Sequence, residues 1–548
     1  MSAYDDEPWL ALRTHPAATP DGAGTVVDAF RATVARDPDG DAVRYFGGRI
    51  SWAELDALTD AFAAAITADG FRPGERVALF LQNVPQFVVA QLGTWKAGGI
   101  AVAINPMNRE RELVELLRDS GSTVLVALGS LYRDVAAHVV DGTAVRSVVT
   151  TSELEYRERD EPRVFAGSAR VDCPGTTDMA DLLGRFRGHP APAVTLGGDD
   201  VAVLTYTSGT TGPPKGAMTT HRNLIVNART YRDWVGLDAS DVVLGVAPLF
   251  HVTGLVGHIA VAVLVGAPLV LMYRLDPAAT LDIAEAEGAT FTVGSITVYV
   301  ALMNAPTASR AKLATLTKIY SGGAPIPPAT VAAFRDAFGH YVHNIYGLTE
   351  TTSPSHAVPF GVEAPVDPMS GALSVGVPVY DTVVRVVDER GAELPVGEVG
   401  ELVVEGPQVV AGYWGKPEET AAALPGGALH TGDVGYMDDR GWFYVVDRKK
   451  DQINAGGYKV WPREVEDVLH EHPAVREAAV VGVPDEYRGE TVKAFVSLRP
   501  GASTTREDIV GFAKQRMAAY KYPRLVEILD ELPKTASGKI LRRELRGR

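Results

Sequence analysis

The chain has 548 residues, of which 46% are hydrophobic and 22% charged, so it is long enough for several domains or for one large enzyme with more than one lobe. Its net charge of −16 argues against nonspecific nucleic-acid binding, which needs a basic surface to displace counterions from phosphates. Cys173 is the only cysteine, which excludes an internal disulfide framework and a four-cysteine zinc site. Any thiol chemistry would therefore use a thiol that the substrate brings.

The start of the chain is acidic and lacks the basic and then apolar run of a signal peptide, so we expect a cytoplasmic protein. The stretch from Val242 to Tyr273 contains no Asp, Glu, Lys or Arg and is long enough to suggest a membrane span. Pro248, Gly254 and Gly266 are among the residues that interrupt it. We therefore interpret this stretch as a buried strand, a loop, a helix and a strand, and expect no membrane span.

The first 130 residues alternate between helical and strand patterns. Ser51 and Glu54 form a capping-box pair ahead of a helix that has apolar residues on one face. Buried strands are predicted over 77–81, 101–104 and 124–128, with helices over 85–99 and 109–121 between them. This order of elements predicts a mostly parallel sheet.

The later part of the chain predicts an α/β fold with a second, smaller lobe. Residues 155–200 have weak periodicity and connect to a buried strand over 201–206, and the segments from 383 to 404 predict hairpins of a β subdomain. We place the main boundary at the charge cluster 448–451. Beyond it we predict an α+β lobe with helices over 464–471 and 504–517 and strands near 478–483 and 492–498.

The stretch YTSGTTGPPKG (206–216) offers three glycines, four Ser or Thr hydroxyls and Lys215 directly after a buried strand. Glycines let the backbone approach an anion, while hydroxyls and N–H groups donate to phosphate oxygens and the lysine adds positive charge. The string is neither the GxxxxGK[ST] nucleotide loop nor the GxGxxG dinucleotide fingerprint. It indicates a phosphate-binding loop, although on its own it is equally consistent with a turn.

Six further strings follow in order, namely APLFH (247–251), SGGAP (321–325), YGLTE (346–350), HTGD (430–433), DRKKDQINAGGYKVWPREVE (447–466) and PKTASGKILRREL (533–545). Together with the phosphate loop they resemble the motifs of the adenylate-forming superfamily, which includes acyl-CoA synthetases, peptide-synthetase adenylation domains and beetle luciferases. The resemblance covers most of the chain and is strongest to the acyl-CoA synthetase, or fatty acid–CoA ligase, branch.

The resemblance implies a two-step ligase that uses ATP, Mg²⁺ and coenzyme A. A carboxylate attacks the α-phosphate of ATP to give acyl-AMP and pyrophosphate, and a thiol then displaces AMP. The matching motif positions imply that ATP and AMP are bound by Thr207, Ser208, Gly209, Thr210, Thr211, Gly212, Lys215, Gly322, Gly323, Ala324, Asn344, Tyr346, Gly347, Asp433 and Arg448. Among these residues, Tyr346 is expected to stack on adenine, and Asp433 and Arg448 to reach the ribose.

The residues expected to take part in the reaction are Lys539, Thr349, Glu350 and His251. Lys539 matches the family's catalytic lysine, whose ammonium can bridge the substrate carboxylate and an α-phosphate oxygen as charge develops. Glu350 matches the glutamate that binds Mg²⁺, the only metal ligand we predict in the protein. Thr349 is expected to donate a hydrogen bond to the α-phosphate.

The resemblance also divides the chain into an adenylation lobe (1–447), a hinge (448–451) and a mobile C-terminal lobe (452–548). Lys450 matches the position at which the C-terminal lobe rotates between the two half-reactions. After rotation, coenzyme A is expected to meet Gly456, Gly457, Tyr458, Lys459 and Arg488. The arginines near the C-terminus, Arg542, Arg543 and Arg546, are interpreted as a solvated basic tail.

The acyl pocket implied by the resemblance is formed by Phe250, His251, Gly254, Ser295, Gly323 and Leu348. The segments around these residues contain no Lys or Arg to hold a second carboxylate. They also lack the Asp with which amino-acid-activating relatives pair the substrate ammonium. We therefore expect an apolar acid, with a fatty chain favoured over an aromatic ring; for His251, a structural core histidine is the alternative.

Coenzyme A is the favoured acceptor because the chain ends at Arg548, shortly after Lys539, with no appended carrier domain. The alternatives are an aryl or phenylpropanoid acid–CoA ligase and a stand-alone ligase that loads a carrier protein. A different class, a catalytically silent nucleotide-binding protein, would be expected to lose Lys539, Glu350 or Asp433. Luciferase-type oxidation is disfavoured because Asn454 stands where luciferases carry a lysine. We expect small-molecule partners, no nucleic acid, and a homodimer as a candidate assembly.

Overall fold

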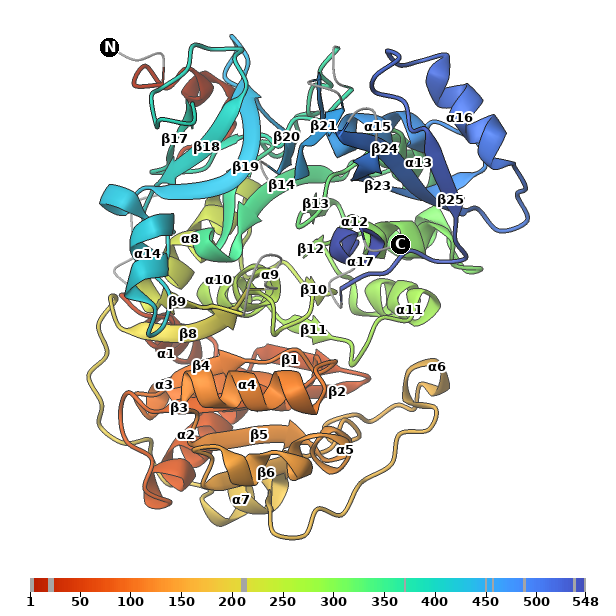
Figure 1. Cartoon of the computed structure of the whole chain (residues 1–548). Coiled ribbons are helices and arrows are strands. Elements are labelled where there is room, and N and C mark those ends of the chain that lie inside the picture. Colours follow the sequence, from red (N-terminus) through yellow and green to blue (C-terminus); the bar gives the residue numbers. More distant parts are fainter. Residues whose placement is uncertain are drawn as a thin grey trace.

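The computed structural model describes residues 4–17, 24–207, 214–368, 371–448, 451–455, 458–485, 489–535 and 539–546. Figure 1 shows one large sheet in the lower part of the molecule, a second sheet above it, and a small C-terminal lobe, coloured blue, on top. The predicted α/β fold, with mixed and mostly parallel sheets and a small α+β lobe, is confirmed.

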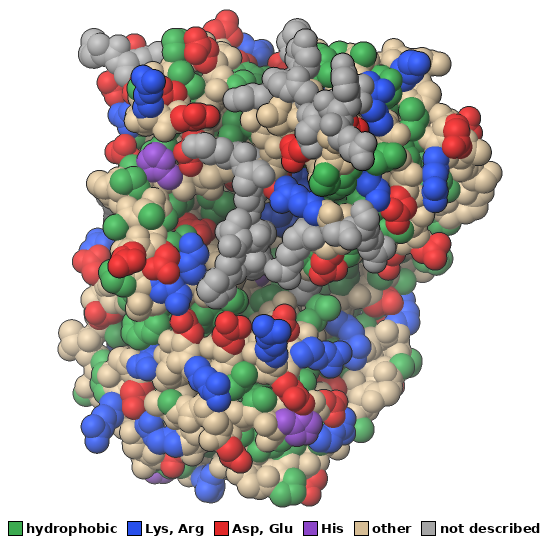
Figure 2. All heavy atoms as spheres, viewed as in Figure 1, with side chains coloured by type: hydrophobic (Ala, Val, Ile, Leu, Met, Phe, Trp, Pro, Cys, Tyr) green, Lys and Arg blue, Asp and Glu red, His purple; other side chains and the backbone are tan. Residues whose placement is uncertain are grey.

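The lower sheet has the strand order β7-β6-β5-β3-β4-β8-β9, in which only the pair β8 and β9 is antiparallel. Its strands are β3 (Arg76–Phe80), β4 (Ile100–Ala103), β5 (Val124–Leu128), β6 (Ser147–Thr151), β7 (Thr177–Asp178), β8 (Val201–Tyr206) and β9 (Gly216–Thr220). Strands β4 and β5 are buried at every position, as the continuous apolar runs predict for a sheet covered on both faces. On the face shown in Figure 2, basic and acidic side chains are intermixed over this part of the molecule.

The helices next to the first of these strands follow the predicted patterns. Helix α2 (Trp52–Ala68) precedes β3, α3 (Pro85–Lys96) lies between β3 and β4, and α4 (Glu110–Ser120) lies between β4 and β5. The Ser51 hydroxyl accepts a hydrogen bond from the Glu54 backbone N–H and caps α2. Helix α3 is buried along its whole length. It ends three residues before the predicted end, because Gly98 adopts a left-handed φ of 74°.

The second sheet has the order β16-β15-β14-β13-β12-β10-β11-β1-β2, and its central strands from β14 to β1 are parallel. The strands are β1 (Asp41–Tyr45), β2 (Gly48–Ser51), β10 (Val243–Gly245), β11 (Leu269–Leu271), β12 (Phe291–Gly294), β13 (Lys318–Ser321), β14 (His343–Leu348), β15 (Ser353–Ala357) and β16 (Val377–Pro378). Its helices include α1 (Val26–Arg36), α8 (His221–Val235), α11 (Pro277–Glu287), α12 (Ile296–Met303) and α13 (Pro328–Phe338). A continuous apolar core joins both sheets.

The predicted β subdomain is an antiparallel sheet of β17 (Val383–Val387), β18 (Gly400–Glu405), β19 (Leu429–Met437) and β20 (Phe443–Arg448). The helix α14 (Pro417–Ala423) lies in the connection between β18 and β19. The C-terminal lobe consists of β21 (Ile453–Ala455), β22 (Tyr458–Val460), α15 (Pro462–His470), β23 (Val475–Asp485), β24 (Gly489–Leu498), α16 (Arg506–Lys514), β25 (Leu525–Ile528) and α17 (Arg542–Leu545). It has its own apolar core, built from Val465, Val480, Ala494 and their neighbours.

The uncharged stretch from Val242 to Tyr273 folds as predicted into a strand, a loop, a helical segment and a strand. Its helical part runs through α9 (Val252–Gly254), a π-helical turn (Leu255–Ala260) and α10 (Val261–Val265). Within the residues that the structure describes, no helix has both the length and the apolar character needed to cross a bilayer. The cytoplasmic location and the homodimer stay predictions.

Several histidines are buried in this core, and we predict that they make the fold sensitive to acid. Burial lowers the pKa of His258 to about 4 and that of His356 to about 3, and neither side chain is exposed. The unfolded chain binds these protons near pH 6.5, so between pH 6.5 and 4 the unfolded state holds more protons and stability falls as pH decreases. Each histidine contributes about 1.4 kcal/mol per pH unit in this window.

Melting temperatures measured from pH 7 to pH 4.5 test this prediction. His258→Gln should show a flatter decline than the unaltered protein, because an amide stays neutral and can still accept the Ala247 N–H that now binds Nε2 of His258 at 3.0 Å. His138→Gln, at a side chain that is 55% exposed, serves as the control and should keep the original slope. Equal slopes in all three proteins would contradict the prediction.

Candidate active site

The residues predicted to contact adenine and the acyl group follow neighbouring parallel strands of the second sheet. His251 follows β10, Ser295 follows β12, the segment 322–324 follows β13, and Gly347 lies at the end of β14. Because the carboxyl ends of parallel strands meet at one edge, these positions lie along a common rim. Ligands of α/β sheets bind in crevices at such rims, which supports the predicted site.

The phosphate loop is the connection between the antiparallel strands β8 and β9 of the lower sheet. Of the predicted residues, Ser208, Gly209, Thr210, Thr211 and Gly212 lie outside the described part of the chain. At the base of the loop, the Thr207 N–H donates to the Lys215 carbonyl at 3.0 Å. The base is therefore closed by a backbone hydrogen bond.

The residues predicted to bind phosphate and metal are linked by one aromatic side chain. The Lys215 ammonium lies 4.5 Å from the ring centroid of Tyr413. The Tyr413 hydroxyl donates a hydrogen bond to Oε1 of Glu350 at 2.6 Å. Lys215 and Glu350 are 135 positions apart in the sequence, and the structure brings both onto Tyr413.

The turn that carries Thr349 and Glu350 is held in an unusual backbone conformation. It forms a short 3₁₀ turn (Thr349–Thr351), after which Thr352 and Ser353 have φ angles of 49° and 84°. Non-glycine residues seldom adopt such angles, and strain of this kind is concentrated at functional sites. The Asn227 side chain of α8 supports the turn by donating to the carbonyls of Thr351 and Thr352.

Gly347 is required by the close approach of two chain segments. A Cβ at this position would lie 1.7 Å from the Ser353 carbonyl oxygen, so any larger residue would displace the turn. Gly322 is similarly confined, since its Cβ would lie 2.7 Å from the Ile345 carbonyl oxygen. The small residues of the predicted adenine wall therefore let neighbouring strand ends pack closely. Gly323 and Ala324 continue the same loop after β13.

The residues predicted to contact adenine and ribose meet in the structure. The Tyr346 hydroxyl donates to Oδ2 of Asp433 at 2.7 Å. Asp433, at 4% exposure, stands opposite Arg448 in the register of β19 and β20. Asn344 behaves differently, because its buried amide donates to the Ser374 carbonyl at 2.9 Å. An ATP contact of Asn344 stays a prediction.

His251 lies in a loop that buried polar side chains hold in place. The Asn83 amide donates to the carbonyls of Gly245 and Ala247, and its oxygen accepts from the Leu249 N–H. The Thr253 N–H donates to Nδ1 of His251 at 3.3 Å. This contact assigns the ring proton of a neutral imidazole to Nε2.

His251 is electrostatically coupled to the C-terminal lobe. Burial and, to a smaller extent, the positive charge of Lys539 together lower the pKa of His251 to about 4. His251 is therefore neutral at physiological pH. The charge of Lys539 acts on the imidazole because the two side chains lie near each other. Lys539 of the C-terminal lobe and His251 of the N-terminal lobe therefore lie at the same site.

The remaining predicted acyl-pocket residues surround the same strand ends. Phe250 is partly buried and packs on the main core, as does Leu348 at the end of β14. Gly254 lies in α9, where a Cβ would be 2.2 Å from the Pro248 carbonyl oxygen. Ser295 precedes α12, and its hydroxyl is 2.7 Å from that of Thr297.

Lys539 is hydrogen-bonded to Thr535 and lies close to an ion-pair network at Arg542. The Lys539 N–H donates to the Thr535 hydroxyl at 3.1 Å, and the Thr535 N–H donates to the Lys539 carbonyl at 2.7 Å. Just beyond, Arg542 forms ion pairs with Asp447, Asp451 and Glu466 at 3.0, 3.2 and 2.7 Å.

The interpretation of Arg542 as part of a solvated tail is wrong. Its side chain is only 20% exposed, and the Asp447 carboxylate that it meets is 3% exposed. The nearby carboxylates raise the pKa of Arg542 against the opposing effect of burial, so the guanidinium stays charged. The error arose because the acidic partners lie 76 to 95 positions away in the sequence.

Comparison with known proteins decides the family. The family model described as AMP-binding enzyme matches residues 30–414, and the model of the AMP-binding enzyme C-terminal domain matches residues 464–539. The chain belongs to the AMP-binding enzyme family. The predicted membership of the adenylate-forming superfamily is confirmed, and the chain is an AMP-forming acyl-CoA synthetase.

The relatives of this AMP-binding enzyme include ligases for different acids. A long-chain-fatty-acid–CoA ligase of Bacillus subtilis (strain 168) is 38% identical, over 98% of this chain and 97% of the relative. A feruloyl-CoA synthase of an Amycolatopsis species is 36% identical, over 93% and 96%. Among solved structures, the anthranilate CoA ligase AuaEII in complex with anthranoyl-AMP is 27% identical and superposes with a TM-score of 0.85, over 97% of each chain.

Some predictions for this enzyme fall outside the described residues. These are Lys450 of the hinge and Gly456, Gly457 and Arg488 of the coenzyme A set. For Arg448, Tyr458 and Lys459 the structure describes the backbone within β20 and β22. The domain limits and the hinge therefore stay predictions.

Sequence reasoning missed several residues that build the site, among them Asn83, Asn227, Tyr413 and Arg542. Each acts through a partner far away in the sequence, so no local spacing reveals it. A partial signal was available for Tyr413, because the string GYWGKPEE (412–419), in the connection after β18, is rich in turn and aromatic residues. His258 had a similar signal, as a polar residue inside an apolar run.

Removing the Arg542 guanidinium should destabilise the C-terminal lobe of this AMP-binding enzyme. Arg542→Met leaves three largely buried carboxylates without their shared cation, and losing one partner of a buried ion pair costs about 3–5 kcal/mol. Arg542→Lys keeps the charge and should lose less. Limited proteolysis and thermal unfolding measure the effect.

Arg546→Met is the matched control for this prediction. Arg546 also pairs with Asp451, at 2.7 Å, but its side chain is 41% exposed. An exposed pair of this kind contributes about 0–1 kcal/mol. If Arg542→Met and Arg546→Met proved equally stable, the buried network would not have the importance that its geometry indicates.

Proposed function

We propose that this acyl-CoA synthetase is a fatty acid–CoA ligase, which forms acyl-AMP from ATP and then the coenzyme A thioester. The observation that carries this proposal is the chemistry of the strand ends. The segments 247–255, 294–297, 322–324 and 345–348 contain no Lys or Arg, so they offer no cation to a second carboxylate. The similarity to long-chain-fatty-acid–CoA ligases over nearly the whole chain supports the same substrate class.

In the first step the enzyme must bring a carboxylate to a polyanion, so cations must offset the charge. Thr207, Lys215 and the rest of the phosphate loop would hold the β- and γ-phosphates. Glu350 would bind Mg²⁺. One protein carboxylate suffices for this ion, because Mg²⁺ keeps several waters and takes further oxygens from phosphates. Within the described residues no cluster of three His, Cys, Asp or Glu forms a separate metal site.

Lys539 and Thr349 would act at the reacting phosphate. The Lys539 ammonium would bridge the acid and the α-phosphate, and the Thr349 hydroxyl would donate to the α-phosphate. The neutral state of His251 supports this arrangement, because a second cation beside Lys539 would compete for the carboxylate. His251 would then line the entrance of the acyl pocket as an uncharged side chain.

The Asp433 carboxylate would accept hydrogen bonds from the ribose hydroxyls, and the Tyr346 ring would stack on the adenine. Their mutual hydrogen bond supports this assignment, since it holds the ring and the carboxylate in one fixed relation. In the second step the C-terminal lobe would rotate at 448–451, Lys539 would leave, and the coenzyme A residues around 456–459 would approach the acyl-AMP. The thiolate sulfur of coenzyme A would attack the acyl carbonyl carbon. The new carbon–sulfur bond would form as the bond from that carbon to the AMP phosphate oxygen breaks and AMP leaves.

Aromatic acids are the second candidate substrates. The feruloyl-CoA synthase and the anthranilate CoA ligase among the similar proteins favour this alternative. A fatty chain would be held mainly by apolar burial, at about 0.8 kcal/mol per methylene, so the enzyme should discriminate chain length only gradually. An aromatic site would instead prefer one ring size sharply.

A panel of acids tests the proposal through ATP–pyrophosphate exchange followed by thioester detection. Exchange should rise gradually with chain length from short to long fatty acids and stay low for benzoate and ferulate. Preferred exchange with an aromatic acid would favour the second candidate. Exchange without a coenzyme A thioester would indicate a carrier-protein acceptor, and no exchange with any acid would leave only nucleotide binding.

Lys539→Ala should separate the two half-reactions. Adenylation should fall at least about 100-fold, the loss expected when a preorganised charge at the reacting centre is removed. Thioester formation from added acyl-AMP should stay near the original rate. Lys514→Ala, at an exposed lysine of the same lobe, is the control for both steps. Equal loss in both half-reactions would refute the role of Lys539 in the first step alone.

A further inference from the structure

The segment after β18 forms an unpredicted wall beside the phosphate loop. It runs antiparallel to β9, since the Met218 N–H donates to the Gly412 carbonyl at 2.8 Å and the Trp414 N–H to the Gly216 carbonyl at 2.8 Å. Its Val410 N–H donates to the backbone carbonyl of Glu350 at 2.9 Å. The segment is therefore hydrogen-bonded both to the strand that leaves the phosphate loop and to the turn that carries Glu350.

Tyr413 is the residue of this segment whose side chain contacts both charges. It is 5% exposed, its ring faces the Lys215 ammonium at 4.5 Å, and its hydroxyl donates to Glu350 at 2.6 Å. A tyrosine hydroxyl is protonated at physiological pH, so it acts as the donor in this contact and the Glu350 carboxylate as the acceptor. Among the described ion pairs none joins Lys215 directly to Glu350.

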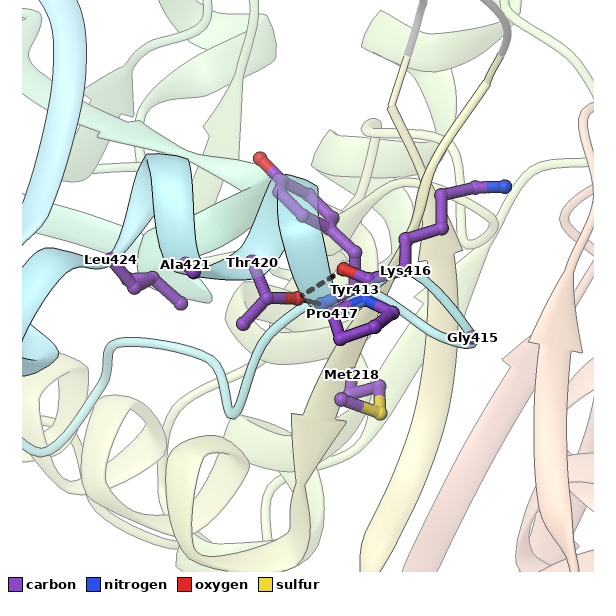
Figure 3. A pocket seen from close by; sticks show the side chains of 8 residues that line it. All are labelled: Met218, Tyr413, Gly415, Lys416, Pro417, Thr420, Ala421 and Leu424. Atoms are coloured by element: carbon purple, nitrogen blue, oxygen red, sulfur yellow. Dashed lines mark hydrogen bonds between the residues drawn. The ribbon is translucent and has the colours of Figure 1, made fainter.

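The backbone at Tyr413 is itself fixed. The Tyr413 N–H donates to the Thr420 hydroxyl at 2.9 Å, and this hydroxyl donates to the Lys416 carbonyl at 2.8 Å. Figure 3 shows both contacts beside a pocket of about 400 Å³, with the Tyr413 ring and the Lys416 side chain leaving the segment in different directions. A ring held on such a support has little freedom to move when ligands bind.

A second contact ties the segment to the other end of the phosphate loop. The Lys416 ammonium is 3.0 Å from Oδ1 of Asp119, and the Tyr206 hydroxyl donates to Oδ2 of the same carboxylate at 2.7 Å. Tyr206 is the last residue of β8, directly before the loop. The segment 413–416 thus contacts the loop directly at Gly216 and is linked to Tyr206, on the other side of the base, through Asp119.

We propose that Tyr413 is a positioning residue for Mg²⁺–ATP: its ring holds the Lys215 ammonium, and its hydroxyl orients the Glu350 carboxylate. A carboxylate oxygen that accepts the tyrosine hydroxyl keeps further lone pairs for a cation, but in a fixed direction. A ring between a cation and an anion also prevents the two from pairing with each other. This proposal rests on the function proposed above, in which Lys215 and Glu350 serve ATP and Mg²⁺.

The two contacts can be removed one at a time. Tyr413→Phe keeps the ring and loses the hydroxyl, so the Mg²⁺ concentration that half-saturates ATP binding should rise about 10-fold, the scale of a hydrogen bond to a charged group. The dissociation constant of ATP at saturating Mg²⁺ should change little. Tyr413→Leu also loses the ring and should weaken ATP binding at saturating Mg²⁺ by a further 3- to 10-fold, about the scale of a cation–π contact.

Calorimetric titration of the full-length protein with ATP, at several Mg²⁺ concentrations and without any acid, gives both quantities. Because no acid is present, the result is independent of which carboxylate the enzyme activates. Tyr444→Phe is the matched control, since the Tyr444 hydroxyl also lies near a carboxylate, Asp438, at 3.4 Å. It should bind ATP with the original Mg²⁺ dependence.

A purely structural role for Tyr413 predicts a different pattern. Tyr413→Phe would then lower the melting temperature or the fraction of active protein, with an unchanged Mg²⁺ midpoint in the molecules that bind. An unchanged midpoint in Tyr413→Phe, or equal shifts in Tyr413→Phe and Tyr444→Phe, would overturn the proposal. ATP binding with the expected shifts but no pyrophosphate exchange would keep the role of Tyr413 and reject the proposed ligase function.

Discussion

The arrangement of the site depends on the parallel pairing of β10, β12, β13 and β14. Parallel strands place their carboxyl ends on the same edge, so four loops from distant parts of the chain reach one rim. The loop after β10 brings His251, and the end of β14 brings Tyr346 and the turn with Glu350. A different order of these strands would move the predicted acyl-pocket residues away from the residues predicted to bind the nucleotide.

Charge is the second constraint, because the chain must keep cations and carboxylates close together without letting them neutralise one another. Neutral side chains that contact the charged groups meet much of this constraint. Tyr413 contacts both Lys215 and Glu350, the Tyr346 hydroxyl occupies one oxygen of Asp433, and His251 stays uncharged within reach of the charge of Lys539. Each neutral partner fixes a charged group in place at a small desolvation cost, since no second charge must be buried.

The sequence predicted the fold class and the motifs because both depend on local patterns. The runs 77–81 and 124–128 are the continuous apolar stretches typical of buried strands, and the Gly- and Thr-rich string at 206–216 begins where β8 ends. Contacts between residues far apart in the sequence could not be predicted from such local patterns. Arg542 was interpreted as tail charge because its carboxylate partners lie 76 to 95 positions away, in β20, in the segment after β20 and in α15.

The Arg542 network also joins the segment that carries Lys539 to both ends of the predicted hinge. Asp447 directly precedes the predicted hinge 448–451, and Asp451 is its last residue. The Arg542 guanidinium contacts both carboxylates. Asp447 is fixed further, because its Oδ2 accepts the Arg463 N–H at 2.9 Å. A carboxylate that is 3% exposed is costly to leave unpaired, so any change that withdraws Arg542 must supply Asp447 with water or another donor. The position of Lys539, three residues before Arg542, is therefore tied to the conformation of the chain at residues 447 and 451.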